Sequence, residues 1–235
     1  MHDPAPNLSE RFSEAMAFAR GVHCTDVRKG TMIPYFAHLM SVSALVLEHG
    51  GSEDQAIAGL LHDAAEDHGG QSMIDTIRAR FGDQVADIVA ACTDSLAEDP
   101  NRKPAWWPRK VAYLDHLQTA HTNALLVSAA DKLHNSRCIL ADYRLCGDEL
   151  WARFNKDAGP IGSLWYYGRL TEIFSARLGG PSPAGQLVEE LQRTVDAIRA
   201  HATVLDHDVH EELRQGRRKE EHARALLRRP EAITE

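Results

Sequence analysis

Apolar residues recur along most of the chain at the three- and four-residue spacing of an α-helix, and the alternation typical of a β-strand is scarce. The first segment of this kind runs through about residue 24, and Asn7 or Ser9 can serve as its N-cap. Similar spacing predicts further helices over residues 53–66, 72–80, 83–94, 108–120, 123–141, 151–156, 163–178 and 184–203, and a charged last helix to about 229. We therefore expect an all-α protein.

Glycine and proline divide these helical segments. Gly69 and Gly70 end the predicted helix 53–66, and residues 94–108, with three prolines, form the longest irregular stretch. A Gly-Gly-Pro break follows residue 178. We expect one main domain over residues 1–180 and a helical C-terminal extension over residues 181–235, for which a contact between copies in a homo-oligomer is the simplest role.

Charge and cysteine usage narrow the class of protein. The formal net charge of −8 argues against a nucleic-acid partner, because phosphate backbones need clustered Lys and Arg. Four cysteines are scattered without CxxC spacing, so neither a zinc ribbon nor a disulfide framework is indicated. No apolar run approaches 20 residues. These features predict a cytoplasmic protein that does not interact with a membrane.

Four candidate metal ligands lie in apolar, helix-patterned segments. His38 occurs in PYFAHLM, His62 and Asp63 adjoin in LLHDAAEDH, and Asp131 occurs in VSAADKLHN. A buried charge without a partner is costly, and a bound cation compensates it. Two imidazoles and two carboxylates, with no thiolate, suit an octahedral ion such as Mn²⁺ that keeps positions open for water and phosphate.

Other polar residues accompany the four ligand candidates. Glu66 and Asp67 follow His62 and Asp63 by four residues, so on one helix they share the ligand-bearing side and can position or deprotonate a water.

A second group of polar residues can bind a substrate. Asn135 follows Asp131 by one helical turn and faces the same space. Arg28 and Lys29 precede the His38 segment and can hold a phosphate or a purine ring.

The order His, His-Asp, Asp is that of HD-type metal phosphohydrolases, and several longer motifs make the likeness specific. From about residue 10 to about residue 178, the sequence resembles the hydrolase domain of the RelA/SpoT family, and most closely its stand-alone small alarmone hydrolases. The matching elements, in order, are VRKGTMIPYFAH, GLLHDAAEDH, RFGDQVADIVAACTD, PRK and SAADKLHNSR. The resemblance implies a compact multi-helix HD-domain bundle.

The resemblance also implies a role for each matched position. The four ligand candidates bind Mn²⁺, and the two acids activate the attacking water. Arg28 and Lys29 line the guanine side of the pocket, Asn135 contacts the ribose or the 3′ phosphates, and Tyr166 is the pocket tyrosine, with Tyr167 as the alternative. The implied reaction removes pyrophosphate from the 3′ position of guanosine tetraphosphate or pentaphosphate, giving GDP or GTP.

The chain departs from the family pattern at three positions. Gly162 stands where small members carry an arginine, His68 where a threonine is usual, and Trp106 near an expected lysine. Phosphate binding must then come from elsewhere, for example from Arg153 or Lys156.

Two other functions stay open. The same metal centre can serve an adenine alarmone, NADPH or a 5′-nucleotide, because Trp106 and Trp107 can stack on any purine. A non-catalytic regulator that senses an alarmone is the other alternative, although such a protein needs no water-activating acids.

Overall fold

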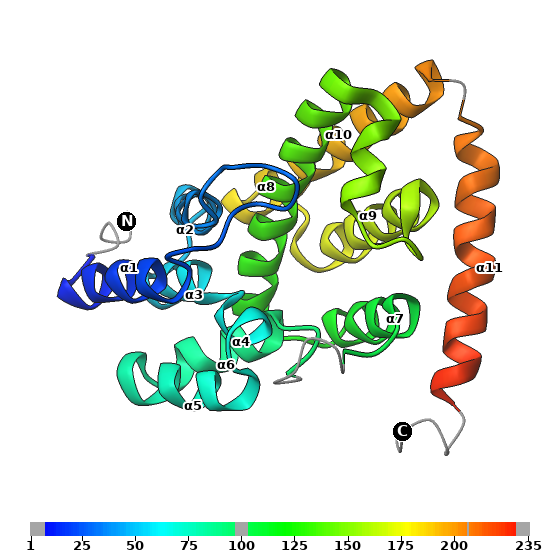
Figure 1. The fold of residues 1–235 in the computed structure, drawn as a ribbon. Coiled ribbons are helices and arrows are strands. Elements are labelled where there is room, and N and C mark those ends of the chain that lie inside the picture. Colours follow the sequence, from blue (N-terminus) through cyan, green and yellow to red (C-terminus); the bar gives the residue numbers. More distant parts are fainter. Residues whose placement is uncertain (1–7, 97–102, 206, 229–235) are drawn as a thin grey trace.

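The structure is a computed structural model that describes residues 8–96, 103–205 and 207–228, and these residues form a bundle of helices (Figure 1). The first half contains α1 (Glu10–Val22), α2 (Phe36–Glu48), α3 (Glu53–Leu61), α4 (Ala64–Asp67), α5 (Gly70–Phe81) and α6 (Asp83–Cys92). The second half contains α7 (Trp106–Leu117), α8 (Thr122–Cys146), the 3-10 helix η2 (Gly147–Arg153), α9 (Gly159–Leu178), α10 (Pro183–Val204) and α11 (Val209–Leu227). Within these ranges the β contacts amount to one isolated bridge, between Val27 and Pro34. The all-α prediction is confirmed.

Side-chain caps fix where several helices begin. Ser9 accepts a hydrogen bond from the backbone N–H of Arg11, which confirms it as the cap of α1. Asn7, the other candidate, lies outside the described residues. Ser52 and Gln55 form a reciprocal capping box at α3, with distances of 2.9 and 3.3 Å between the paired atoms. The start of α3 therefore follows from local sequence alone.

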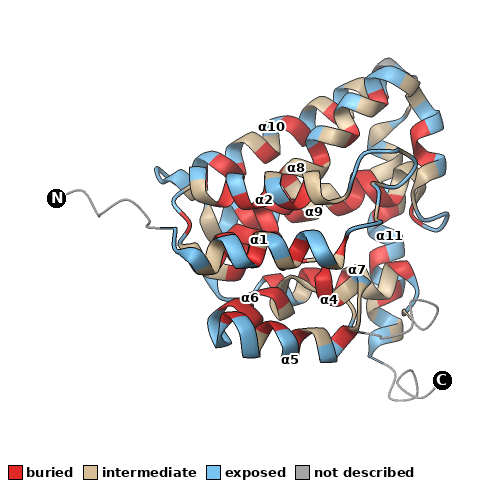
Figure 2. Ribbon diagram, turned by 60° about the vertical axis from the view of Figure 1, so that its left-hand side comes forward, coloured by how far each residue is buried: buried red, intermediate tan, exposed pale blue. Residues whose placement is uncertain are grey.

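The long helix α8 runs through the centre of the bundle. It packs against α2, α3, α6, α9 and α10, and buried residues occupy the inner faces of the helices while exposed ones cover the outside (Figures 1 and 2). Leu125, Ala130 and Leu133 on α8 are fully buried, and Asp131 lies between the last two. A carboxylate in this position is held in the interior of the protein.

The residues after 180 cover the same core. Leu187, Leu191 and Val195 on α10 are buried in the main hydrophobic cluster, and α11 packs against α7 and α9 (Figure 1). The apolar face of α10 is therefore used within the chain. Residues 229–235 of the predicted extension lie outside the described part. Among the described helices, none is both long and apolar enough to cross a lipid bilayer.

Two predicted helices were wrong in detail. The helix expected over 53–66 is broken, because α3 ends at Leu61 and α4 begins at Ala64, and Gly69 then separates α4 from α5 with a left-handed φ of 116°. The helix expected over residues 151–156 is replaced by the 3-10 helix η2, which begins at Gly147 and ends at Arg153. Apolar spacing did not distinguish a continuous helix from a broken one.

Candidate active site

The four candidate ligands come together in the interior of the bundle. His38 comes from α2, Asp131 from α8, and the adjacent pair from the junction between α3 and α4. Nε2 of His62 lies 3.0 Å from Oδ2 of Asp63, and Nε2 of His38 lies 3.3 Å from Oδ1 of Asp131. The cross distances are 3.7 Å from His38 to Asp63 and 3.6 Å from His62 to Asp131. Three segments that are far apart in sequence thus present their polar atoms to one point.

The break between α3 and α4 allows adjacent residues to share this point. On a continuous helix, side chains of neighbouring residues diverge by about 100°. His62 is the C-cap of α3 and Asp63 the N-cap of α4, so both lie where the regular helix is interrupted, and their polar atoms approach to 3.0 Å. The helix interruption that sequence periodicity missed is therefore part of the site.

Hydrogen bonds at the far side of each imidazole orient the ring. Nδ1 of His62 donates to the carbonyl of Gly59 at 2.9 Å, which leaves Nε2 with a lone pair in the neutral ring. Nδ1 of His38 lies 2.8 Å from Nδ1 of His134. Burial and the nearby His38 lower the pKa of His134 to about 4, so the His134 ring is neutral and can accept from His38.

The Nε2 atoms of His38 and His62, which face the centre of the cluster, are available to bind a cation. Among the described residues, Nε2 of His38 and Nε2 of His62 are both buried without a hydrogen-bond partner, although carboxylate oxygens lie nearby. They therefore do not point directly at those oxygens. Nitrogen atoms of His38 and His62 and an oxygen of Asp131 lie within 4.8 Å of one another, a spacing that fits a shared divalent ion.

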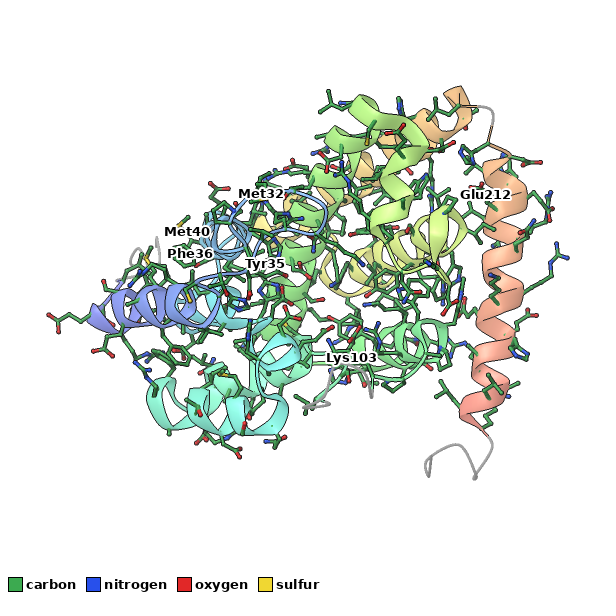
Figure 3. All side chains as sticks on the ribbon, viewed as in Figure 1. Met32, Tyr35, Phe36, Met40, Lys103 and Glu212 are labelled. Atoms are coloured by element: carbon green, nitrogen blue, oxygen red, sulfur yellow. The ribbon has the colours of Figure 1, made fainter. Side chains whose placement is uncertain are left out.

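Two further side chains hold the carboxylates in place. The ammonium of Lys132 lies 2.6 Å from Oδ2 of Asp131, and although burial opposes ionisation, this charge holds the pKa of that carboxyl well below its usual range. The hydroxyl of Tyr35 donates to Oδ2 of Asp63 at 2.5 Å. Figure 3 shows Tyr35 at the end of the loop that leads into α2.

Glu66 and Asp67 lie in the short helix α4, directly after the metal-ligand candidates. Oε1 of Glu66 lies 3.1 Å from Nζ of Lys103, which precedes α7 (Figure 3). Burial and the negative charge of Asp94 raise the pKa of Glu66. Asp67 is exposed at the surface, and partial desolvation with the charge of Asp63 raises its pKa to about 7. Both acids are thus more basic than ordinary surface carboxylates.

A cavity of about 640 Å³ adjoins His38, and the four residues predicted to bind substrate all line it: Arg28, Lys29, Asn135 and Tyr166. A hydrogen-bonded chain connects the loop to the metal-ligand candidates. Arg28 donates to Oδ1 of Asn135 at 2.9 Å, and the amide of Asn135 donates to Asp131 at 2.5 Å. The hydroxyl of Tyr166 is buried without a hydrogen-bond partner in the described residues, so a ligand in the cavity can supply one.

The packing of the cavity wall also explains why a glycine stands at residue 162, where the family pattern has an arginine. A Cβ added at this residue would lie 3.2 Å from the indole of Trp106, which is itself 9% exposed and lines the cavity. The lack of a side chain at 162 is thus what makes room for the tryptophan. Arg153 lines the same cavity and is paired with Asp142 at 2.8 Å, whereas Lys156 is not among the lining residues.

Sequence reasoning missed several polar residues around the site. Lys132 follows a ligand candidate directly, and Tyr35 precedes the His38 helix by one residue, so proximity in sequence was the available signal. Lys110 lines the cavity, lies 5.0 Å from the centre of the Tyr166 ring and pairs with Asp94 at 2.5 Å. Nothing in the local pattern around Asp94 distinguishes it from a surface acid.

Comparison with known proteins assigns the family. An HD domain model matches residues 15–157, and the chain therefore belongs to the HD domain family. The chain is 32% identical over 142 residues to the guanosine-3′,5′-bis(diphosphate) 3′-pyrophosphohydrolase MESH1 of Xenopus tropicalis, a match that covers 59% of this chain and 73% of that protein. A second relative, the guanosine-3′,5′-bis(diphosphate) 3′-pyrophosphohydrolase of Aquifex aeolicus, is 35% identical over 88 residues, which are 37% of this chain and 12% of that protein.

Solved structures share the fold. The crystal structure of lmo0812 from Listeria monocytogenes EGD-e superposes with a TM-score of 0.57 at 30% identity, covering 68% of this chain and 97% of that one. A metazoan SpoT orthologue, described as hydrolysing ppGpp, superposes with a TM-score of 0.60 at 21% identity, covering 82% of this chain and 97% of that one. The helix arrangement is therefore common to several proteins with divergent sequences.

Proposed function

We propose that this protein hydrolyses the 3′ diphosphate of guanosine tetraphosphate or pentaphosphate, releasing pyrophosphate and leaving GDP or GTP. The observation that carries the proposal is the lining of the cavity, which contains Arg28, Lys29, Asn135 and Tyr166 together with His38 of the His/Asp cluster. The names of the relatives in Xenopus tropicalis and Aquifex aeolicus, both 3′-pyrophosphohydrolases of guanosine bis(diphosphate), support the same substrate.

Mn²⁺ is the ion that we propose for the cluster, and His38, His62, Asp63 and Asp131 would hold it. Two oriented imidazoles with unpartnered nitrogens and two carboxylates, without a thiolate, are a donor set of the kind that suits this ion. When bound, the ion supplies Lewis-acid polarisation of the scissile phosphate and neutralises part of its charge.

The acids of α4 would carry the proton transfers. In the hydrolysis, the oxygen of water forms a bond to phosphorus, and the bond between that phosphorus and the ribose 3′ oxygen breaks. Glu66 or Asp67 takes the proton from the attacking water, and the departing 3′ oxygen receives one to become a hydroxyl. The raised pKa values of Glu66 and Asp67 support this role, because a general base works best when its pKa lies near the working pH.

The cavity residues would recognise the nucleotide. Arg28 and Lys29 bring positive charge to an otherwise acidic chain, and the buried ammonium groups of Lys110 and Lys132 add two more cations along the cavity wall. A substrate with several phosphates can pair with these groups.

Product analysis by phosphorus NMR tests the proposal. Purified protein with Mn²⁺ and guanosine tetraphosphate should release inorganic pyrophosphate and GDP, and it should act on GDP alone far more slowly. Release of single phosphates, or no turnover with bound metal, would contradict the proposed reaction.

A second candidate function is hydrolysis of another purine nucleotide. The observation that favours it is the pair Gly162 and Trp106, which stand where the family pattern has an arginine and a lysine and which form an aromatic part of the cavity wall. An adenine alarmone, NADPH and simple 5′-nucleotides therefore belong in the same assay. Faster turnover of one of these compounds would change the assigned substrate and leave the proposed metal chemistry unchanged.

A further inference from the structure

A second cluster of metal-ligating side chains lies where α1, the loop before α2 and the end of α4 meet. His23 is the C-cap of α1, Asp26 lies in the following turn, and His68 is the C-cap of α4. Nδ1 of His23 lies 2.8 Å from Oδ2 of Asp26, and Nε2 of His68 lies 2.6 Å from the same oxygen. The two imidazole rings lie 4.8 Å apart and are nearly perpendicular, at 83°.

The burial of these side chains resembles that of a metal site with access to water. The side chain of His23 is fully buried, whereas those of Asp26 and His68 are 31% and 34% exposed. Asp26 is the one hydrogen-bonding partner of the His23 ring among the described residues, and the other ring nitrogen is buried without one. Nδ1 of His23 and Nε2 of His68 both face Oδ2 of Asp26, so three potential ligand atoms meet at one point.

We propose that His23, Asp26 and His68 form a second divalent-metal site, for a borderline first-row ion such as Zn²⁺. One ligand atom from each residue lies within 4.8 Å of the others. Two imidazoles and one carboxylate are a common donor set for such ions, and the exposed side leaves room for water to complete the coordination.

The second site is separate from the His38 cluster, because the side chain of Tyr35 lies between them. The Tyr35 ring stacks on His23 with centres 5.3 Å apart, and it meets His38 edge-on at 5.4 Å. Its hydroxyl donates to Asp63. The two clusters share no ligand, so each can bind an ion independently.

An ion at the second site would connect two functional segments. The carbonyl of Asp26 accepts from the N–H of Tyr35 at 2.8 Å, and the bridge between Val27 and Pro34 closes the loop that carries Arg28 and Lys29. His68 directly follows the acids of α4. The ion would therefore cross-link the base of the substrate loop to α4, a structural role that does not depend on the proposed reaction.

Metal stoichiometry of chelator-stripped protein dialysed against Zn²⁺ tests this site. We expect two ions per chain in the wild type, and one in each of the partly exposed ligand variants His68→Thr and Asp26→Asn. The double variant His62→Gln/Asp63→Asn, which removes two ligands of the first cluster, should retain one ion. Cys24→Ser, which changes an exposed thiol beside His23, is the matched control and should retain two.

Thermal unfolding supplies a readout that does not require activity. Saturating Zn²⁺ should raise the melting temperature of the His62→Gln/Asp63→Asn variant by about 5 °C, and adding His68→Thr to it should abolish the rise. Equal Zn²⁺ content in wild type, His68→Thr and Asp26→Asn would overturn the proposal and leave a hydrogen-bonded His-Asp-His cluster. Loss of nucleotide turnover has no bearing on this result, so failure of the proposed function and failure of the second site are distinguishable.

Discussion

The two histidine and aspartate clusters use the same residue types but differ in how the protein supports them. In the first cluster, Nδ1 of His38 and Nδ1 of His62 each have a hydrogen-bond partner outside the cluster. Lys132 and Tyr35 contact the carboxylates. In the second, His23 and His68 both face one oxygen of Asp26. The first cluster is oriented by residues that are not ligands, whereas the second is oriented by its own ligands.

The surroundings of the two clusters differ as well. His38, His62 and Asp131 are 0%, 3% and 5% exposed, and His38 lines a cavity that also contains cationic residues. The second cluster opens to solvent and adjoins no large cavity in the described residues. Burial strengthens electrostatic interactions, and the cavity admits a charged substrate. Chemistry is therefore expected at the first cluster and cross-linking at the second.

Removal of a carboxylate from the first cluster should have the largest effect. Asp63→Ala deletes a ligand candidate and the hydrogen-bond acceptor of Tyr35, so metal at this cluster and turnover should both fall below detection. Elemental analysis and phosphorus NMR measure the two. Unchanged turnover with a full complement of metal would show that the first cluster is not the catalytic one.

Neutralising the acids of α4 should separate catalysis from metal binding. Glu66→Gln and Asp67→Asn should keep the metal but lower kcat by a factor on the order of 10² to 10⁴, the usual range for general acid and base groups. Their metal content, measured alongside, is the control. Wild-type rates in both variants would assign these acids a structural role.

Substitution of Lys29, in the loop before α2, should affect substrate affinity more than the catalytic rate. Lys29 lines the cavity, and Lys29→Ala should raise KM for guanosine tetraphosphate about tenfold with little change in kcat, because phosphate pairing is made equally in ground and transition states. Lys156→Ala, outside the cavity lining, is the matched control. A fall in kcat without a change in KM would move Lys29 from binding to catalysis.

A methyl group at residue 162 should produce a smaller effect of the same kind. In Gly162→Ala the new Cβ lies within about 3 Å of Ala158 and Trp106, so the indole must shift in the cavity wall. We expect KM to change by about threefold, and the intrinsic fluorescence of Trp106 to change with it. Identical kinetics and fluorescence would show that the wall accommodates the methyl group.

The smallest effect on turnover is expected from the second cluster. His68→Thr should remove the ion that links α4 to the loop while leaving kcat within about twofold of wild type, because the four ligands of the first cluster are untouched. Steady-state kinetics in excess Mn²⁺ measure this. A loss as large as that of Asp63→Ala would mean that both clusters serve the reaction.

The sequence determined the class of fold and most of the site. Helical spacing and glycine and proline breaks are local signals, and they predicted most of the helices without tertiary information. The ligand candidates were found because charged residues in apolar segments need compensation. Asn135 and Tyr166 were predicted to bind substrate from a helical turn and from resemblance, and both line the cavity.

Tertiary structure alone decided how these residues meet. Apolar periodicity is the same for a continuous and an interrupted helix, so the turn at His62 and Asp63 depends on packing of α3 and α4 against their neighbours. The fit of Trp106 against Gly162 and the approach of His23 to His68 join residues 56 and 45 positions apart. Such contacts depend on the shape of the folded core, which is set by many side chains at once and has no local pattern in the chain.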